Sequence, residues 1–324
     1  LNNYYIQGER AYNMRYSTLA IPERIQRLKT DLFAVGQDGA TPFCFERAKI
    51  VTRSYQQTEG QHPALRRARA LHAVFDQMPI FIRPGELIVG QRAAVLAGRA
   101  VYPEYHLNGL TQANTPAEIW DYWHGRTLGD RARGAHPARL QRAEREMAAG
   151  YCTGTASGFG HGIVDYPKAL ERGFRSIVAE AQALLEDTPE EDREGRAFLQ
   201  AAVIAGEGIT LWAQRYAALA EAEAAAETDP RRKQELSRIA RICRRVPAEP
   251  ARDFSEALQA FGFVHLAMHV EQYGWSISAG RFDQTMWPYY RQDIASETLT
   301  QEQAWELLLN LWVKFMENVG TRLK

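Results

Sequence analysis

The sequence predicts a mostly α-helical protein with a few short strands. Apolar residues recur at helical spacing in several segments, and residues 201–227 are long and rich in alanine, the strongest helix former. These apolar stripes lie at residues 64–78, 254–268 and 304–315. Only "ELIVG", Glu86 to Gly90, is a short apolar run between turn residues, which is typical of a buried strand. No internal repeat or linker divides residues 1–324, so we treat them as one domain.

Capping signals mark where the predicted helices begin. Asp253 followed by Glu256 resembles a capping box, in which each side chain accepts a hydrogen bond from the backbone of the other residue. Thr300 and Gln303 repeat the pattern before the last apolar stripe. Pro230 ends one long helix and opens the next.

The composition excludes several classes of protein. Thirty-nine basic and 39 acidic side chains give a formal net charge of zero over 324 residues, so nothing favours nucleic acid or an anionic membrane as partner. No apolar run approaches the ~18 residues of a membrane span, and the start lacks the pattern of an export signal. The three cysteines are far apart, which favours a reducing cytoplasm over a disulfide framework. We therefore expect a cytoplasmic protein.

The ends of the sequence suggest a piece of a longer protein. It begins with Leu1 rather than Met, and it stops at "NVGTRLK" without a natural finish. We expect further chain outside the 324 residues.

Two histidines have the spacing of a metal-binding pair. His265 and His269 are four residues apart on one predicted helix. In zincins a glutamate directly follows the first histidine, but here that position is Leu266. A helix this apolar more often buries histidines whose nitrogens are hydrogen-bonded, so we predict no metal.

The glycine-rich segment "TGTASGFGHGIVDYP", residues 153–167, allows three interpretations. A phosphate cradle would need a preceding strand, and "EMAAGYCT" is a poor one. A tight turn is the plain alternative, because glycine adopts positive φ. Glycines also let the backbone approach a ligand, and His161 has little local packing to satisfy it.

The segment "GWSISAGRFDQTMWPYY", residues 274–290, resembles one carried by glycyl radical enzymes of the pyruvate formate-lyase superfamily, in the branch around coenzyme-B12-independent glycerol dehydratase. Further segments resemble this family in the same order. They are "ERAKIVTRSYQQTEGQHPALRRARAL", "IFIRPGELIVGQR", "GFGHGIVDYPKALERGF", "RKQELSRIARICRRVP" and "FSEALQAFGFVHL". The resemblance covers residues 24–322.

The resemblance implies a fold and a chemistry. The fold is the N-terminal part of a ten-stranded α/β barrel wrapped in helices. A glycyl radical, installed after translation by a radical S-adenosylmethionine activating enzyme, oxidises a cysteine to a thiyl radical. The thiyl abstracts hydrogen from a small-molecule substrate, and a neighbouring group (water, an amine or sulfite) is eliminated. The resemblance also implies a homodimer without a bound cofactor or metal.

The resemblance assigns substrate contact to His161, Trp275 and Ser276. Trp275 departs from the dehydratase pattern, which has a second histidine there; an indole has one donor and no acceptor. Glycerol is therefore disfavoured, and another diol, choline, isethionate, hydroxyproline or an aryl acetate fits better. A core aromatic is the alternative role for Trp275. For Arg281 and Asp283 we predict a hydrogen-bonded pair that holds this loop to the barrel.

The radical motifs of the family are absent from the sequence. Cys44, Cys152 and Cys243 do not match the context of the thiyl cysteine, and the glycyl radical loop is missing. We therefore expect no catalytic residue within these 324 residues and no activity from them alone. Two alternatives stay open for the function: a non-catalytic pseudoenzyme or interaction scaffold, and a formate-lyase-type acyltransferase.

Overall fold

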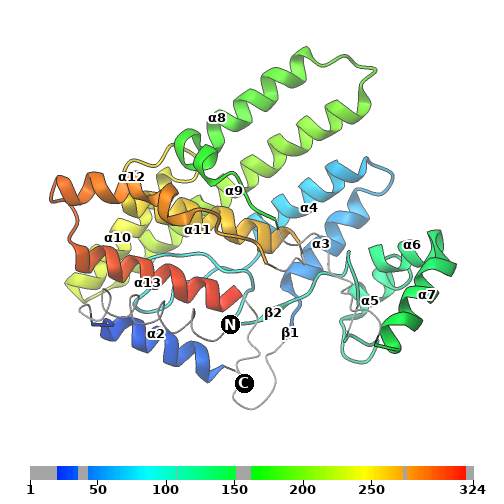
Figure 1. Ribbon diagram of the computed structural model, residues 1–324, viewed down its shortest axis with the longest axis horizontal. Coiled ribbons are helices and arrows are strands. Elements are labelled where there is room, and N and C mark those ends of the chain that lie inside the picture. The colour runs from blue at the N-terminus through cyan, green and yellow to red at the C-terminus, as the bar shows by residue number, and fades with distance from the viewer. Residues whose placement is uncertain (1–19, 36–42, 108, 151–161, 273–275, 319–324) are drawn as a thin grey trace, which may run out of the picture.

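The computed structural model describes residues 20–35, 43–107, 109–150, 162–272 and 276–318, and these are mostly helical, as predicted (Figure 1). Two short strands, β1 (Phe43–Cys44) and β2 (Arg99–Ala100), pair in parallel, with Phe43 opposite Arg99. The helices are α2 (Glu23–Ala34), α3 (Glu46–Gln57), α4 (Pro63–Gln77), α5 (Ala117–Trp123), α6 (Leu128–Ala135), α7 (Pro137–Ala148), α8 (Tyr166–Asp187), α9 (Arg193–Ala226), α10 (Pro230–Arg245), α11 (Phe254–Glu271), α12 (Phe282–Ala295) and α13 (Gln301–Asn318).

Helix α11 forms the centre of the core. It is apolar on nearly every side, and most of its residues are buried, as expected of a helix covered all round. It contacts α8, α9, α10, α12 and α13 (Figure 1). The distal parts of α8 and α9 extend away from this core as a long hairpin (Figure 1). Because α11 contacts these five helices, it is held in a fixed position at the centre of the core.

The predicted caps are confirmed in one helix and half confirmed in the other. Thr300 and Gln303 form a complete box at α13, because each side chain accepts from the backbone N–H of the other, at 3.2 and 3.0 Å. At α11, the Asp253 carboxylate accepts from the Glu256 N–H at 2.8 Å. The Glu256 carboxylate instead accepts from the N–H of Arg252 and pairs with its guanidinium. The predicted bond from the Asp253 N–H to the Glu256 side chain is therefore wrong.

The strand predicted at Glu86–Gly90 is also wrong. This segment is buried but irregular, and side chains from two helices bind its backbone. The Val89 N–H donates to Gln259 Oε1, and the Val89 carbonyl accepts from Gln259 Nε2, both at 2.9 Å. The Leu87 N–H donates to Asn310 Oδ1 at 3.0 Å. Amide side chains of α11 and α13 thus satisfy the groups that a neighbouring strand would satisfy.

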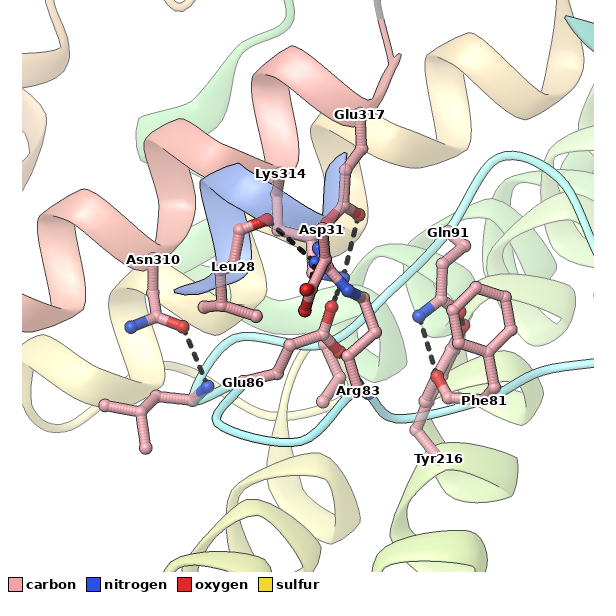
Figure 2. Close-up of polar contacts among 12 residues, drawn as sticks. Leu28, Asp31, Phe81, Arg83, Glu86, Gln91, Tyr216, Asn310, Lys314 and Glu317 are labelled. Atoms are coloured by element: carbon pink, nitrogen blue, oxygen red, sulfur yellow. Dashed lines mark hydrogen bonds and ion pairs between the residues drawn. The ribbon is translucent and has the colours of Figure 1, made fainter. Parts of the chain in front are cut away.

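A buried group of charges holds the same segment against α13 and α2 (Figure 2). Lys314 lies between two carboxylates, Glu86 and Glu317, and its Nζ is 3.0 Å from Glu317 Oε2. Arg83 pairs with Glu317 at 2.5 Å and donates to the Leu28 carbonyl of α2 at 2.8 Å. Burial disfavours the charged Lys314 ammonium, but the two carboxylates outweigh it, so the pKa of Lys314 is raised.

Among the described residues, no helix combines the length and apolar character required to span a bilayer.

Candidate functional site

The structure places the two segments that carry the predicted site residues side by side. Ile163 and Ser278 form an isolated parallel bridge, in which the Ser278 N–H donates to the Gly162 carbonyl at 2.8 Å. His161 and Trp275 lie outside the described residues, but their neighbours Gly162 and Ser276 lie within them. Segments more than 110 positions apart in the sequence therefore meet, and the roles of His161 and Trp275 stay predictions.

The two segments approach each other closely at position 280. A Cβ on Gly280 would lie 2.6 Å from Ile163 Cδ1, and Gly280 has φ +63°. Glycine meets both requirements, because it has no Cβ and adopts positive φ freely. The Ile163 side chain is itself 65% exposed, although it is large and apolar. The backbone bridge thus sets the register of the two segments, and Ile163 leaves an apolar surface open beside it.

Ser276 has an unusual backbone conformation. Its φ is +61°, in the left-handed region, which costs a non-glycine residue about 1–2 kcal/mol. The residue is exposed, and among the described residues no hydrogen bond involves its hydroxyl. A serine hydroxyl both donates and accepts, so it can bind a substrate hydroxyl or an oxyanion. Strain of this kind is concentrated at functional sites.

A buried tyrosine supports the segment 276–280 from the side of the core. The Tyr166 hydroxyl lies 2.9 Å from His265 Nδ1 and 3.2 Å from the Ser278 carbonyl oxygen. Both contacts are satisfied when neutral His265 donates from Nδ1 and the tyrosine hydroxyl donates to Ser278. The Tyr166 ring stacks on Phe261 with centroids 4.2 Å apart. Residues of α8 and α11 thus orient the backbone of the 276–280 segment.

The histidine pair of α11 is buried and neutral. Burial lowers the pKa of His265 to about 4, and burial, followed by the proximity of His265 and Arg92, lowers the pKa of His269 to about 3. Within the described part of the chain, no group of three or more His, Cys, Asp or Glu side chains could hold a metal. The prediction that His265 is a hydrogen-bonded core histidine is confirmed by its contact with Tyr166.

Arg47 of α3 caps the C-terminal end of α11. Its Nε donates to the Val270 carbonyl at 2.6 Å, and its Nη2 donates to the Glu271 carbonyl at 3.0 Å. The guanidinium lies over the Tyr102 ring at 4.0 Å, and the Tyr102 hydroxyl donates to a third carbonyl of this turn. Glu104 balances the charge of Arg47, which is only 3% exposed. A cation here also suits the negative end of the helix dipole, so this turn is held firmly just before the 276–280 segment.

Comparisons with known proteins identify the family of the chain. The family model described as "Pyruvate formate lyase-like" matches residues 17–323. The chain belongs to the pyruvate formate lyase-like family.

Relatives in this family include several lyases. The chain is 36% identical over 317 residues to an isethionate sulfite-lyase of Oleidesulfovibrio alaskensis, which covers 87% of the chain and 38% of the relative. The glycerol-bound B12-independent glycerol dehydratase from Clostridium butyricum superposes with a TM-score of 0.79 at 33% identity, over 92% of the chain and 40% of that structure. A glycyl radical enzyme from Archaeoglobus fulgidus has the same TM-score and identity, over 91% and 40%. The chain therefore spans about two fifths of the length of these relatives.

Within this pyruvate formate lyase-like chain, some positioning residues escaped prediction from the sequence. Arg47 and Tyr166 bind residues more than 100 positions away, and no local pattern reports such contacts. The hydrogen-bonded pair predicted for Arg281 and Asp283 does not form in the described structure, where both side chains are exposed at the start of α12. Its two members are near in sequence, but α12 begins between them and directs them into solvent.

Proposed function

We propose that this chain forms part of the substrate cavity of a glycyl radical lyase, which eliminates water, an amine or sulfite from a small hydroxylated substrate. The contact between residues 162–163 and 276–280 is the observation that supports this proposal most. It joins the two segments for which the family resemblance predicts substrate contact. The names of the relatives, a sulfite-lyase and a dehydratase, support the reaction class.

The residues of this chain would bind and orient the substrate. The protein radical of the family, where present, supplies the hydrogen abstraction. Ser276 would hold a substrate oxygen, and fixed donors of this kind act strongly in a site that excludes water. Ile163 would cover the substrate carbon skeleton. We also propose that His161 contacts a substrate hydroxyl and that Trp275 adds an apolar or cation-binding face.

The test begins with the intact gene product, activated under anaerobic conditions by a radical S-adenosylmethionine enzyme. Electron paramagnetic resonance should show a glycyl radical, and no radical after activation would favour the pseudoenzyme or scaffold. Activated protein is then screened with glycerol, 1,2-propanediol, isethionate, choline and hydroxyproline. A carbonyl product from one of them, or a cyclic imine in the case of hydroxyproline, supports the lyase, whereas formate and acetyl-coenzyme A from pyruvate and coenzyme A would identify the acyltransferase.

Ser276→Gly tests the site itself. Glycine keeps the positive φ and removes the hydroxymethyl side chain of an exposed residue, so the fold should be as stable as before or more so. We expect kcat/KM to fall about tenfold, equivalent to about 1.4 kcal/mol of lost transition-state binding. The control is Ser296→Ala, which also removes the hydroxyl of an exposed serine, here directly after α12. Ser176→Gly is not used as the control, because a glycine inside α8 would weaken that helix. Unchanged kinetics in Ser276→Gly would remove Ser276 from the site.

We propose two further properties from the family resemblance, a homodimer and a cytoplasmic location. Light scattering on the purified protein tests the first, and fractionation of the source cells tests the second. A monomer at micromolar concentration, or recovery outside the cytoplasmic fraction, would contradict these proposals.

A further inference from the structure

A pocket lies beside the capped end of α11, on the side of α3 and α4. Its cavity volume is about 150 Å³. At about 30 Å³ per water in the liquid, this space would hold about five waters, or one small organic molecule. Apolar side chains line part of it, among them Leu71, Val74 and Trp123. The pocket therefore offers apolar contact to a small molecule.

The polar lining carries an excess of positive charge. Four arginine guanidinium groups and two carboxylates, Glu104 and Glu271, face the pocket, which leaves two positive charges in excess. Glu59 pairs with one of these arginines, Arg126, at 3.4 Å near the rim. With Glu59 counted, one positive charge still remains. An anion is therefore favoured over a cation.

Three of the four guanidinium groups have N–H groups without a hydrogen bond to a described residue, and one of the three, Arg126, already pairs with Glu59 through Nη1. Arg47 is fully used by Glu104 and by backbone carbonyls. Arg67 donates from Nε to Glu271 and from Nη2 to the Tyr105 hydroxyl, and its Nη1 has no hydrogen bond to a described residue. The exposed Arg131 has no ion pair or side-chain hydrogen bond within the described ranges. Arg67 and Arg131 thus present unused N–H groups at the pocket.

We propose that this pocket binds a small organic anion, a carboxylate or sulfonate of two to four carbons. Its oxygens accept hydrogen bonds from Arg67 and Arg131, because guanidinium N–H groups match the geometry of such oxyanions. Its hydrocarbon part packs against Leu71 and Val74. This site does not depend on the proposed lyase activity, because binding requires no radical.

Isothermal titration calorimetry on the intact, unactivated protein tests the proposal. The probes are propionate and propane-1-sulfonate at constant ionic strength set with chloride, with tetramethylammonium as the cationic comparison. Both anions should bind saturably at one site, and tetramethylammonium should not. Arg67→Gln and Arg131→Gln should each weaken anion binding at least tenfold. Arg142→Gln, which changes a guanidinium on α7 that is 78% exposed, is the matched control and should bind as before.

Two further outcomes decide between sites. If Arg67→Gln proves unstable because Glu271 loses its partner, the exposed Arg131→Gln still gives the answer. Ser276→Gly should bind the anions normally. Binding that is lost in Ser276→Gly and kept in Arg131→Gln would place the anion at the proposed substrate site, residues 162–163 and 276–280. That result would overturn the proposal that the pocket binds it. Absence of saturable binding would overturn it as well, and would leave a cavity filled by water only.

Discussion

At the scale of single residues, Tyr166 connects the core to the candidate site. Its ring is buried against Phe261, while its hydroxyl reaches both His265 and the Ser278 carbonyl. One hydroxyl group therefore joins the helical core to the backbone of the candidate site. The pattern of the sequence predicts that His265 is satisfied, but it does not identify Tyr166 as the partner, because their separation of 99 positions is set by the packing of α8 on α11.

Tyr166→Phe removes this hydroxyl and little else. A buried His265 Nδ1 without a partner costs about 1–3 kcal/mol, so the free energy of unfolding should fall by that amount. Urea denaturation measures the change. Tyr289→Phe is the control, because Tyr289 is half-buried and no hydrogen bond of its hydroxyl is present in the described structure. Equal stability of the two variants would show that the Tyr166 hydroxyl contributes nothing.

The neutral state of His265 makes the stability of the protein depend on pH. Its pKa is about 4 when folded and about 6.5 when unfolded, so the unfolded state binds the proton more tightly. The contribution is complete above pH ~6.5 and is lost as the pH falls toward 4, for a total of about 3 kcal/mol. His265→Asn should reduce this loss when unfolding is measured from pH 7 to pH 4.5. The exposed His124→Asn should leave it unchanged, and an identical pH profile for all three proteins would contradict the assignment.

At the scale of elements, the crossing of two irregular segments sets the geometry of the site. The helices were predicted well because apolar periodicity and capping residues are local signals. The strand at 86–90 was predicted wrongly because its burial is visible in the sequence but its partners are not: they are Gln259 and Asn310, far along the chain. A buried apolar run predicts burial, and the distant packing decides which groups satisfy its backbone.

Gly280→Ala tests the crossing directly. Alanine would incur the cost of a positive φ and would also collide with Ile163, 2.6 Å from the added Cβ. Gly60→Ala is the matched control, since Gly60 has φ +79° and nothing within 4 Å of an added Cβ. We expect Gly280→Ala to lose about 0.5 kcal/mol more than the control in urea denaturation, because the exposed Ile163 side chain must move aside. In protein that also carries Ile163→Ala, the extra loss caused by Gly280→Ala should disappear. Equal losses in Gly280→Ala and Gly60→Ala would refute the close approach.

At the scale of the whole molecule, buried charges join parts of the chain that are distant in sequence. Lys314 of α13 lies between Glu86 and Glu317, and Arg83 extends the group to α2 (Figure 2). Nothing in the local sequence identifies these charges as buried, because lysine and glutamate on a helix usually face solvent. The predicted site is limited in the same way: its segments were recognised, but their contact and their support by Arg47 and Tyr166 required the structure.

Lys314→Met leaves Glu86 without its cation in the core. Breaking one partner out of a buried pair typically destabilises by about 3–5 kcal/mol, and we expect a loss of this size in the free energy of unfolding. Lys314→Met with Glu86→Gln should recover part of it, because the uncompensated charge is then gone. Lys168→Met changes an exposed lysine on α8 and should have little effect. A loss below about 1 kcal/mol in Lys314→Met would contradict this account.

The capping of α11 by Arg47 also has a consequence for the order of biosynthesis. Arg47 and the Val270 carbonyl are 223 residues apart. At the ribosomal rate of about 5–20 residues per second, Arg47 is made about 10–45 s before the carbonyl that it binds. During that interval its guanidinium must stay solvated or pair with Glu104, which is made soon after it. The turn that leads into the candidate site can therefore acquire its final shape only after Val270 and Glu271 have been made.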